Sequence, residues 1–243
     1  CCKIIAKCKK YGAFISVDSD AHFSAFVGVY DCARKLLDEG NYNVSRVIAR
    51  PYKVIDGKPS RISKDRRDYS MIPPHNILNE ICEKGGKVIG IGKIEDIFSK
   101  SGITHAIHTG SNKEGLELTL KAVKNELDLD KISIAPCGDE NFEFIFTNLV
   151  DTDMLFGHRN DAKGYGEAIE EVDKYLKDIV DNLSENDILI ITADHGCDPT
   201  VPGTDHTREY VPVLIYGKNI KAKDLGLIQG FDFIASLIKN HLF

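Results

Sequence analysis

The stretch ILIITADHGCDPTVPGTDHTRE, residues 188–209, decides the fold that we predict for this chain. It opens with an apolar run, 188–191, that is typical of a buried parallel strand. Asp194 and His195 follow this strand at once, and ligands of open α/β sheets collect at the carboxyl ends of strands. The sequence therefore predicts an α/β fold with a polar site at this strand end.

The loop after this strand predicts a metal site. Its bend is formed by Gly196, Pro199, Pro202 and Gly203. We expect the bend to bring Asp205 and His206 back toward the strand end. One carboxylate and two imidazoles on a rigid loop suit an ion of the zinc or manganese class. The alternative is a hydrogen-bonded loop that holds no metal.

A second strand-end loop carries a similar pair of residues. An apolar strand is predicted over 143–150, and Asp153 and His158 follow it. Alone, Asp153 would serve equally well as a helix cap and His158 as a surface residue. Two Asp/His loops at strand ends in one chain favour a shared site. Asp161 is a predicted cap for a helix over 162–183.

Basic residues are dense between residues 45 and 67. A predicted strand over 45–49 ends in Arg50, and a turn at Asp56 and Gly57 leads to Arg66. The planar arginine fork matches phosphate oxygens, although a solvated positive face is the alternative. Lys93 follows a glycine at the end of a predicted strand, 87–91, where it is well placed to reach an anion.

Composition limits the kind of protein this is. The chain has 243 residues, of which 42% are hydrophobic and 28% charged, the values of an ordinary soluble protein. A net charge of −6 argues against nucleic acid as the main partner. No apolar run approaches the roughly 20 residues that cross a bilayer, so we expect no membrane association. Seven cysteines without framework spacing indicate reduced thiols and a cytoplasmic location.

Four motifs resemble one protein family. TADHGCDPTVPGTDHTREYVPVLIY resembles the C-terminal metal-binding motif of phosphopentomutases, in the alkaline phosphatase superfamily. NLVDTDMLFGHRNDAKGYG resembles the second core signature of that family. VSRVIARPY followed by RRDY, and GKIEDIF, resemble motifs of its cap domain. The resemblance implies an alkaline-phosphatase-like α/β core, present in part, with an inserted α/β cap domain.

The resemblance also implies a division into domains. Residues 1–23 would be a core-edge or junction segment, 24–125 the cap that binds the substrate phosphate, and 126–243 the C-terminal half of the metal-binding core. The first residue is not Met. We expect that the natural chain continues upstream.

By the same resemblance, two Mn²⁺ ions are expected. Asp153, His158 and His206 would bind one ion, and Asp194 and His195 the other. Arg50 and Arg66 would hold the substrate phosphate, with Lys93 and Asp18 near the sugar phosphate. The family also uses a further aspartate and a phosphorylated threonine, and neither motif is matched in this chain. The catalytic nucleophile is therefore unassigned.

The implied activity is interconversion of ribose or deoxyribose 1-phosphate and 5-phosphate, with a small sugar phosphate as the only partner. Alternatives are another metal phosphoesterase of the same superfamily and an inactive fragment that binds metal and phosphate. A third alternative comes from CKKYGAFISVDSDAHFSAFVG, which resembles the closing segment of PHP-family metal phosphoesterases. There Asp20 and His22 would bind metal.

Overall fold

The computed structural model describes residues 34–40, 44–49, 52–62, 67–138, 140 and 142–243. The chain divides into two compact units. One contains the described residues up to Pro74 together with 96–101, and the other contains His75–Glu95 and Gly102–Phe243. Most of the segment 75–125, which the sequence placed in the cap, thus lies in one unit with the C-terminal half. Which segments act as cap and core stays a prediction, and the expected junction at 1–23 lies outside the described residues.

The first unit contains two antiparallel strand pairs. β1 (Arg46–Ala49) pairs with β4 (Arg67–Ser70), and β2 (Tyr52–Ile55) pairs with β3 (Lys58–Arg61). Asp56 and Gly57 join β2 to β3 with φ angles of 50° and 75°. Positive φ at both central residues is the requirement of a type I′ hairpin turn, which Asp-Gly meets readily. The turn predicted at these two residues is confirmed.

The second unit is organised around a parallel sheet of three strands in the order β6-β5-β7. Their bounds are β5 (Lys87–Ile91), β6 (His105–Ile107) and β7 (Glu143–Thr147). The central strand β5 is buried at four successive positions, 88–91, so both of its faces are covered. On one face, Ile89 and Ile91 pack with Ala122. A central parallel strand needs apolar residues at successive positions, which is why its sequence reads as a continuous apolar run.

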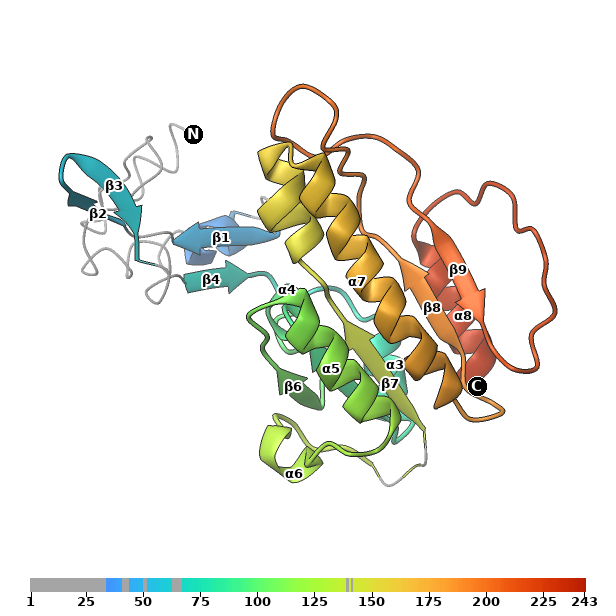
Figure 1. Ribbon diagram of the computed structural model, residues 1–243. Coiled ribbons are helices and arrows are strands. Elements are labelled where there is room, and N and C mark those ends of the chain that lie inside the picture. Colours follow the sequence, from blue (N-terminus) through green and yellow to red (C-terminus); the bar gives the residue numbers. More distant parts are fainter. Residues whose placement is uncertain (1–33, 41–43, 50–51, 63–66, 139, 141) are drawn as a thin grey trace. The chain divides into compact units, whose positions relative to one another are not determined.

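From residue 75 onward the α-helices are α3 (Ile77–Glu83), α4 (Ile94–Ile97), α5 (Asn112–Val123), α6 (Leu129–Ile132), α7 (Ala162–Asp181) and α8 (Asp232–Leu242). Of these, α3 and α5 contact β5, α5 also contacts β7, and α6 contacts β6. Figure 1 shows α5 and α7 side by side, and the two helices contact each other. Asp161 caps α7, because its Oδ1 accepts a hydrogen bond of 2.9 Å from the backbone N of Gly164. This confirms the predicted cap. Among the described residues, no helix has the length and apolar character needed to span a bilayer.

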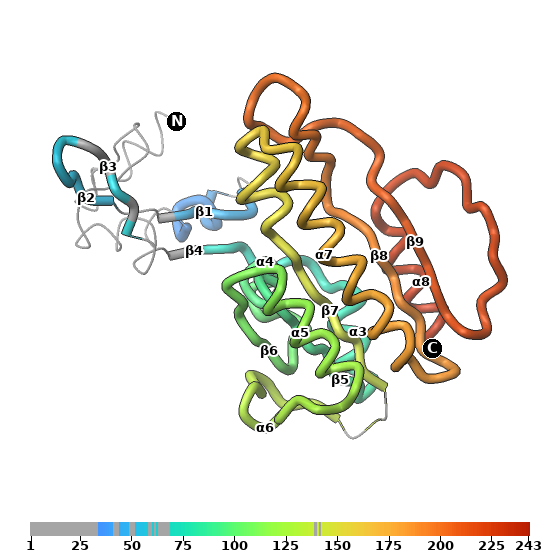
Figure 2. Tube along the Cα trace, viewed as in Figure 1, coloured from blue at the N-terminus to red at the C-terminus, as the bar shows by residue number. Residues whose placement is uncertain are grey.

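The strand that opens the quoted stretch differs from its prediction. β8 (Leu189–Thr192) pairs antiparallel with β9 (Val213–Tyr216), and its residues are half-buried or exposed. The prediction of a buried parallel strand was therefore wrong in both respects. An apolar run indicates packing, but the direction of the neighbouring strand depends on how the chain returns. Figure 2 traces that return, from β8 through a long loop into β9 and through another into α8.

We expect a buried histidine to make the stability of the second unit depend on pH. His105 on β6 is 4% exposed, and its Nδ1 lies 2.8 Å from the Thr104 hydroxyl. Burial lowers the pKa of His105, nearby Lys87 lowers it further, and Glu143 and Asp130 act in the opposite direction. The unfolded chain therefore takes up this proton before the folded chain does as the pH falls.

We expect the free energy of unfolding to fall as pH drops through about 6.5, by at most about 1.4 kcal/mol per pH unit from this group. The contribution is fully present above that pH. His105→Asn keeps a hydrogen-bonding atom near the position of Nδ1. Its free energy of unfolding should change less between pH 7.5 and 5.5 than that of the unmodified protein. Urea unfolding at several pH values measures the difference, and identical slopes in the two proteins would contradict the assignment.

Candidate metal centre

The first loop of the site begins where β7 ends, and a reciprocal pair of hydrogen bonds fixes its start. Asp151 Oδ2 accepts from the backbone N of Asn112 at 2.7 Å, and Asn112 Oδ1 accepts from the backbone N of Asp151 at 2.9 Å. Both residues are buried. Because Asn112 opens α5, the Asp151 carboxylate lies at the positive end of that helix. The loop carrying Asp153 therefore departs from an anchored position.

Two short irregular helices then present the predicted ligands. η3 (Thr152–Phe156) is a π-helix that contains Asp153, and η4 (Gly157–Arg159) is a 3₁₀ helix that contains His158. Single π-helical turns occur often at functional sites, since they change the direction of side chains within a short segment. Here the irregular winding places Asp153 and His158 on neighbouring positions of one loop.

The second loop leaves β8 with Asp194 and His195 and then folds back on itself. Gly196 forms an isolated antiparallel bridge with Thr207, whose backbone N donates to the Gly196 carbonyl at 3.0 Å. A Cβ on Gly196 would lie 2.7 Å from the Thr207 carbonyl oxygen, so only glycine permits this approach. The bridge brings His206 beside His195, as the bend in the sequence predicted.

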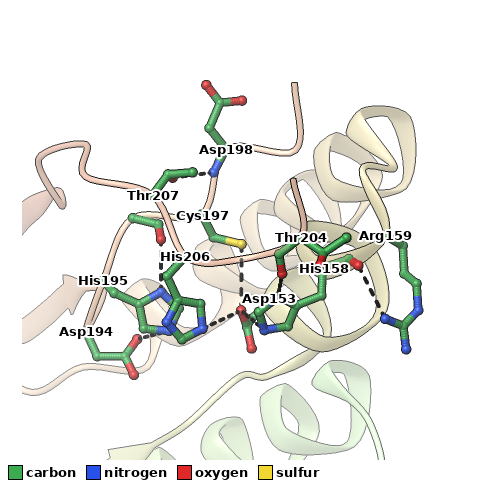
Figure 3. A network of polar contacts seen from close by, with 11 residues as sticks. Asp153, His158, Arg159, Asp194, His195, Cys197, Asp198, Thr204, His206 and Thr207 are labelled. Carbon is green, nitrogen blue, oxygen red and sulfur yellow. Dashed lines mark hydrogen bonds and ion pairs between the residues drawn. The ribbon is translucent and has the colours of Figure 1, made fainter. Parts of the chain in front are cut away.

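The two loops meet at the Asp153 carboxylate (Figure 3). Asp153 Oδ1 lies 3.3 Å from His158 Nε2 and 3.4 Å from His206 Nε2. The rings of His195 and His206 are stacked with centroids 3.6 Å apart, and those of His158 and His206 are 5.0 Å apart. Three imidazoles thus surround one carboxylate at the convergence of two strand ends.

The donor set fits a metal ion. Among the described residues, Asp153, His195 and His206 each offer a ligand atom, and these atoms all lie within 4.8 Å of one another. Two ligands at about 2.1 Å from one ion are at most about 4.2 Å apart, so small side-chain rotations would bring all three onto an ion. One carboxylate with imidazoles is a set that zinc- and manganese-class ions accept.

A ring of further contacts orients these ligands. Cys197 Sγ donates to Asp153 Oδ1 over 3.6 Å. Burial, and then the Asp153 carboxylate, raise the pKa of the Cys197 thiol, which keeps it a donor. His158 Nδ1 contacts the Thr204 carbonyl at 2.5 Å, and His195 Nδ1 contacts the Gly196 carbonyl at 3.0 Å. Such partners of the non-ligating nitrogen set ring orientation in metal sites.

The other predicted site residues are Asp194, Lys93 and five residues outside the described part of the chain. The Asp194 side chain is 78% exposed, and its Oδ1 lies 3.7 Å from His195 Nε2. Lys93 follows Gly92, whose φ of 86° ends β5. The other predicted substrate and metal residues lie outside the described residues: Asp18, Asp20, His22, Arg50 and Arg66.

Sequence reasoning missed several residues of this site. Cys197 stands inside the quoted motif, two positions after His195, but nothing in its spacing indicated a hydrogen bond to Asp153. Asn112 and Asn160 lie outside any Asp/His pattern, although an asparagine just after a helical 3₁₀ turn is a known signal for a left-handed residue. The described ligand atoms also group His195 with Asp153 and His206, whereas the resemblance assigned His158 to that ion.

Comparisons with known proteins agree with these motifs. Residues 71–243 match the family model described as the metalloenzyme superfamily. A phosphopentomutase from Clostridium kluyveri is 46% identical over 85% of this chain and 49% of its own length. Phosphopentomutases from Alkaliphilus metalliredigens and Anaeromyxobacter are 46% and 47% identical, over 87% and 86% of this chain and 51% and 50% of their own lengths.

The chain spans about half the length of the curated relatives it matches. A solved structure of the PH0037 protein from Pyrococcus horikoshii is similar with a TM-score of 0.46 and 19% identity, over 87% of this chain and 58% of that one. The sequence relatives and the family model confirm the resemblance that the motifs predicted, and the mixed α/β architecture with its parallel sheet confirms the predicted fold class.

Proposed function

Because this chain belongs to the metalloenzyme superfamily, we propose that it provides the metal centre of a phosphopentomutase. The reaction would interconvert ribose or deoxyribose 1-phosphate with the corresponding 5-phosphate. The phosphopentomutase relatives are similar over more than four-fifths of this chain. We further propose a cytoplasmic location, which agrees with the absence of disulfides at the described Cys82, Cys137 and Cys197.

One observation carries the proposal: two loops, about 40 residues apart in sequence, bring three imidazoles around the Asp153 carboxylate. Phosphoryl transfer develops negative charge on the moving group, and cations fixed beside it stabilise that charge. Metal ions bound there would supply electrostatic stabilisation of the charge on the reacting oxygens. The ligands on this chain would be Asp153, His158, Asp194, His195 and His206.

Manganese is the ion that we propose, with two ions in the complete site. The test is metal content after chelation and re-addition: the purified protein is stripped with chelator, dialysed against Mn²⁺, Zn²⁺ or Mg²⁺, and assayed for bound metal. We expect stoichiometric Mn²⁺. A protein that takes up no manganese would overturn the metal assignment.

The phosphate clamp is proposed to consist of Arg50, Arg66 and Lys93, with Asp18 near the sugar. Replacing Arg50 with alanine should weaken sugar-phosphate binding by roughly 10- to 100-fold, the scale of losing a charge-assisted bidentate contact of about 1.5–3 kcal/mol. Manganese content should not change. Lys53→Ala is the matched control, because it removes an exposed positive charge on β2. Calorimetric titration with ribose 5-phosphate measures the effect, and equal affinity for all three proteins would show that the clamp is misassigned.

The reaction itself distinguishes the mutase from its alternatives. Ribose 1-phosphate converted to ribose 5-phosphate indicates the mutase, and release of inorganic phosphate indicates a phosphoesterase of either kind. Metal binding without turnover indicates a fragment that binds metal and phosphate only. The third outcome has a physical basis, since no segment of this chain matches the threonine motif that carries phosphoryl in the family.

A further inference from the structure

The turn at residues 157–160 is hydrogen-bonded to the loop that carries His195 and His206. Asn160 follows η4 and adopts the left-handed conformation, with φ of 53° and ψ of 33°. Its side-chain Nδ2 donates to the backbone carbonyls of Pro199 at 3.3 Å and Val201 at 2.9 Å. Both acceptors belong to the bend between His195 and His206. The Asn160 side-chain amide therefore links the loop of Asp153 and His158 to the middle of the loop between His195 and His206.

Asparagine suits this position for two separate reasons. It tolerates the left-handed region, which is unfavourable for most residues other than glycine. Its NH₂ group also has two donor hydrogens, which matches the two carbonyls within hydrogen-bond distance of Nδ2. Glycine would meet only the first requirement, and aspartate would meet the first while replacing the donors with acceptors.

We infer that Asn160 is a positioning residue that sets the separation of the two loops and thereby the spacing of the metal ligands. This inference rests on the proposed metal site. Asp153 and His158 lie on one loop, and His195 and His206 on the other, so a shift between the loops changes the distances between ligands of one ion. Asn160 is itself exposed, so its hydrogen bonds contribute little to the folded core and mainly fix this relative position.

The test compares Asn160→Asp with a matched control, Asn125→Asp. Asn125 is also left-handed, with φ of 59°, and it follows α5. We expect Asn160→Asp to weaken Mn²⁺ binding by roughly 10- to 100-fold, as substitutions around metal ligands do, and to leave the melting temperature of the metal-free protein nearly unchanged. Asn125→Asp should bind Mn²⁺ as the unmodified protein does. Asn160→Gly, which retains the backbone conformation, should give an intermediate loss and serves if the aspartate variant does not fold.

A second readout separates positioning from general destabilisation. With the site saturated by Co²⁺, the visible absorption bands report ligand geometry, and we expect them to shift in Asn160→Asp but not in Asn125→Asp. If the unmodified protein binds Mn²⁺ and Asn160→Asp binds it equally well with the same Co²⁺ spectrum, the positioning role is wrong. If the unmodified protein binds neither ion, the proposed metal centre fails, and the inference fails with it.

Discussion

Replacing Asp153 with asparagine is expected to weaken metal binding by roughly 100-fold or more. Substitutions of residues that only support metal ligands weaken binding by about 10- to 100-fold, and Asp153 is itself a proposed ligand. The carboxylate is the group on which the site converges, because its Oδ1 lies within 3.4 Å of both His158 Nε2 and His206 Nε2. Asparagine keeps the shape of the side chain and removes the negative charge. The remaining imidazoles are neutral ligands and cannot offset the charge of a divalent cation.

Thermal unfolding with and without metal measures this effect. At a Mn²⁺ concentration 100 times the dissociation constant, the unmodified protein should gain about 2.7 kcal/mol of stability, whereas a variant with 100-fold weaker binding gains about 0.4 kcal/mol. Without metal, the two should differ by about 1 kcal/mol or less, because Asp153 is partly exposed and polar contacts of exposed side chains contribute little. Asp173→Asn, on an exposed position of α7, is the control. Equal stabilisation by Mn²⁺ in Asp153→Asn would show that this carboxylate is not a ligand.

Replacing Gly157 with alanine is expected to destabilise the folded protein by about 1–3 kcal/mol, the usual cost of overpacking. The backbone of Gly157 has φ of −58° and ψ of −60°, so any residue could adopt its conformation. Space is what requires glycine, since a Cβ would lie 2.2 Å from Cys197 Sγ and 3.0 Å from the Thr152 carbonyl oxygen. The thiol would have to move, which would also break its contact with Asp153.

A double-mutant cycle tests this origin. In Cys197→Ala the sulfur is absent, and the Cys197 Cβ lies 3.6 Å from the added methyl group, an ordinary contact. We therefore expect Gly157→Ala to lower the free energy of unfolding less in the Cys197→Ala background than in the unmodified protein. The difference, which is the coupling free energy, should be about 1 kcal/mol or more. Urea unfolding of the four proteins gives the coupling free energy. Strictly additive losses would mean that the clash with the Thr152 carbonyl dominates.

The sequence alone indicated much of the local structure. The apolar run of β5 predicted its bounds, and the helix after Asp161 begins at its predicted residue. It also predicted two loops with Asp/His pairs, because chemistry-bearing residues directly after apolar runs mark strand ends. What it could not show was the antiparallel neighbour of β8, since an apolar run reports burial and not the direction of the adjacent strand.

By itself, then, the sequence determined the family, the two loops with Asp/His pairs and the bend that returns His206 to His195, because each depends on residues near one another in the chain. Only the tertiary structure decided that Asp153 is the shared contact, that His195 stacks on His206, and that Cys197 and Asn160 join the two loops. Apart from the His195–His206 stack, these contacts join residues that lie 41 to 53 positions apart in the chain. Their distances are set by how α7 and β8 carry the chain from one loop to the other, which no local pattern encodes.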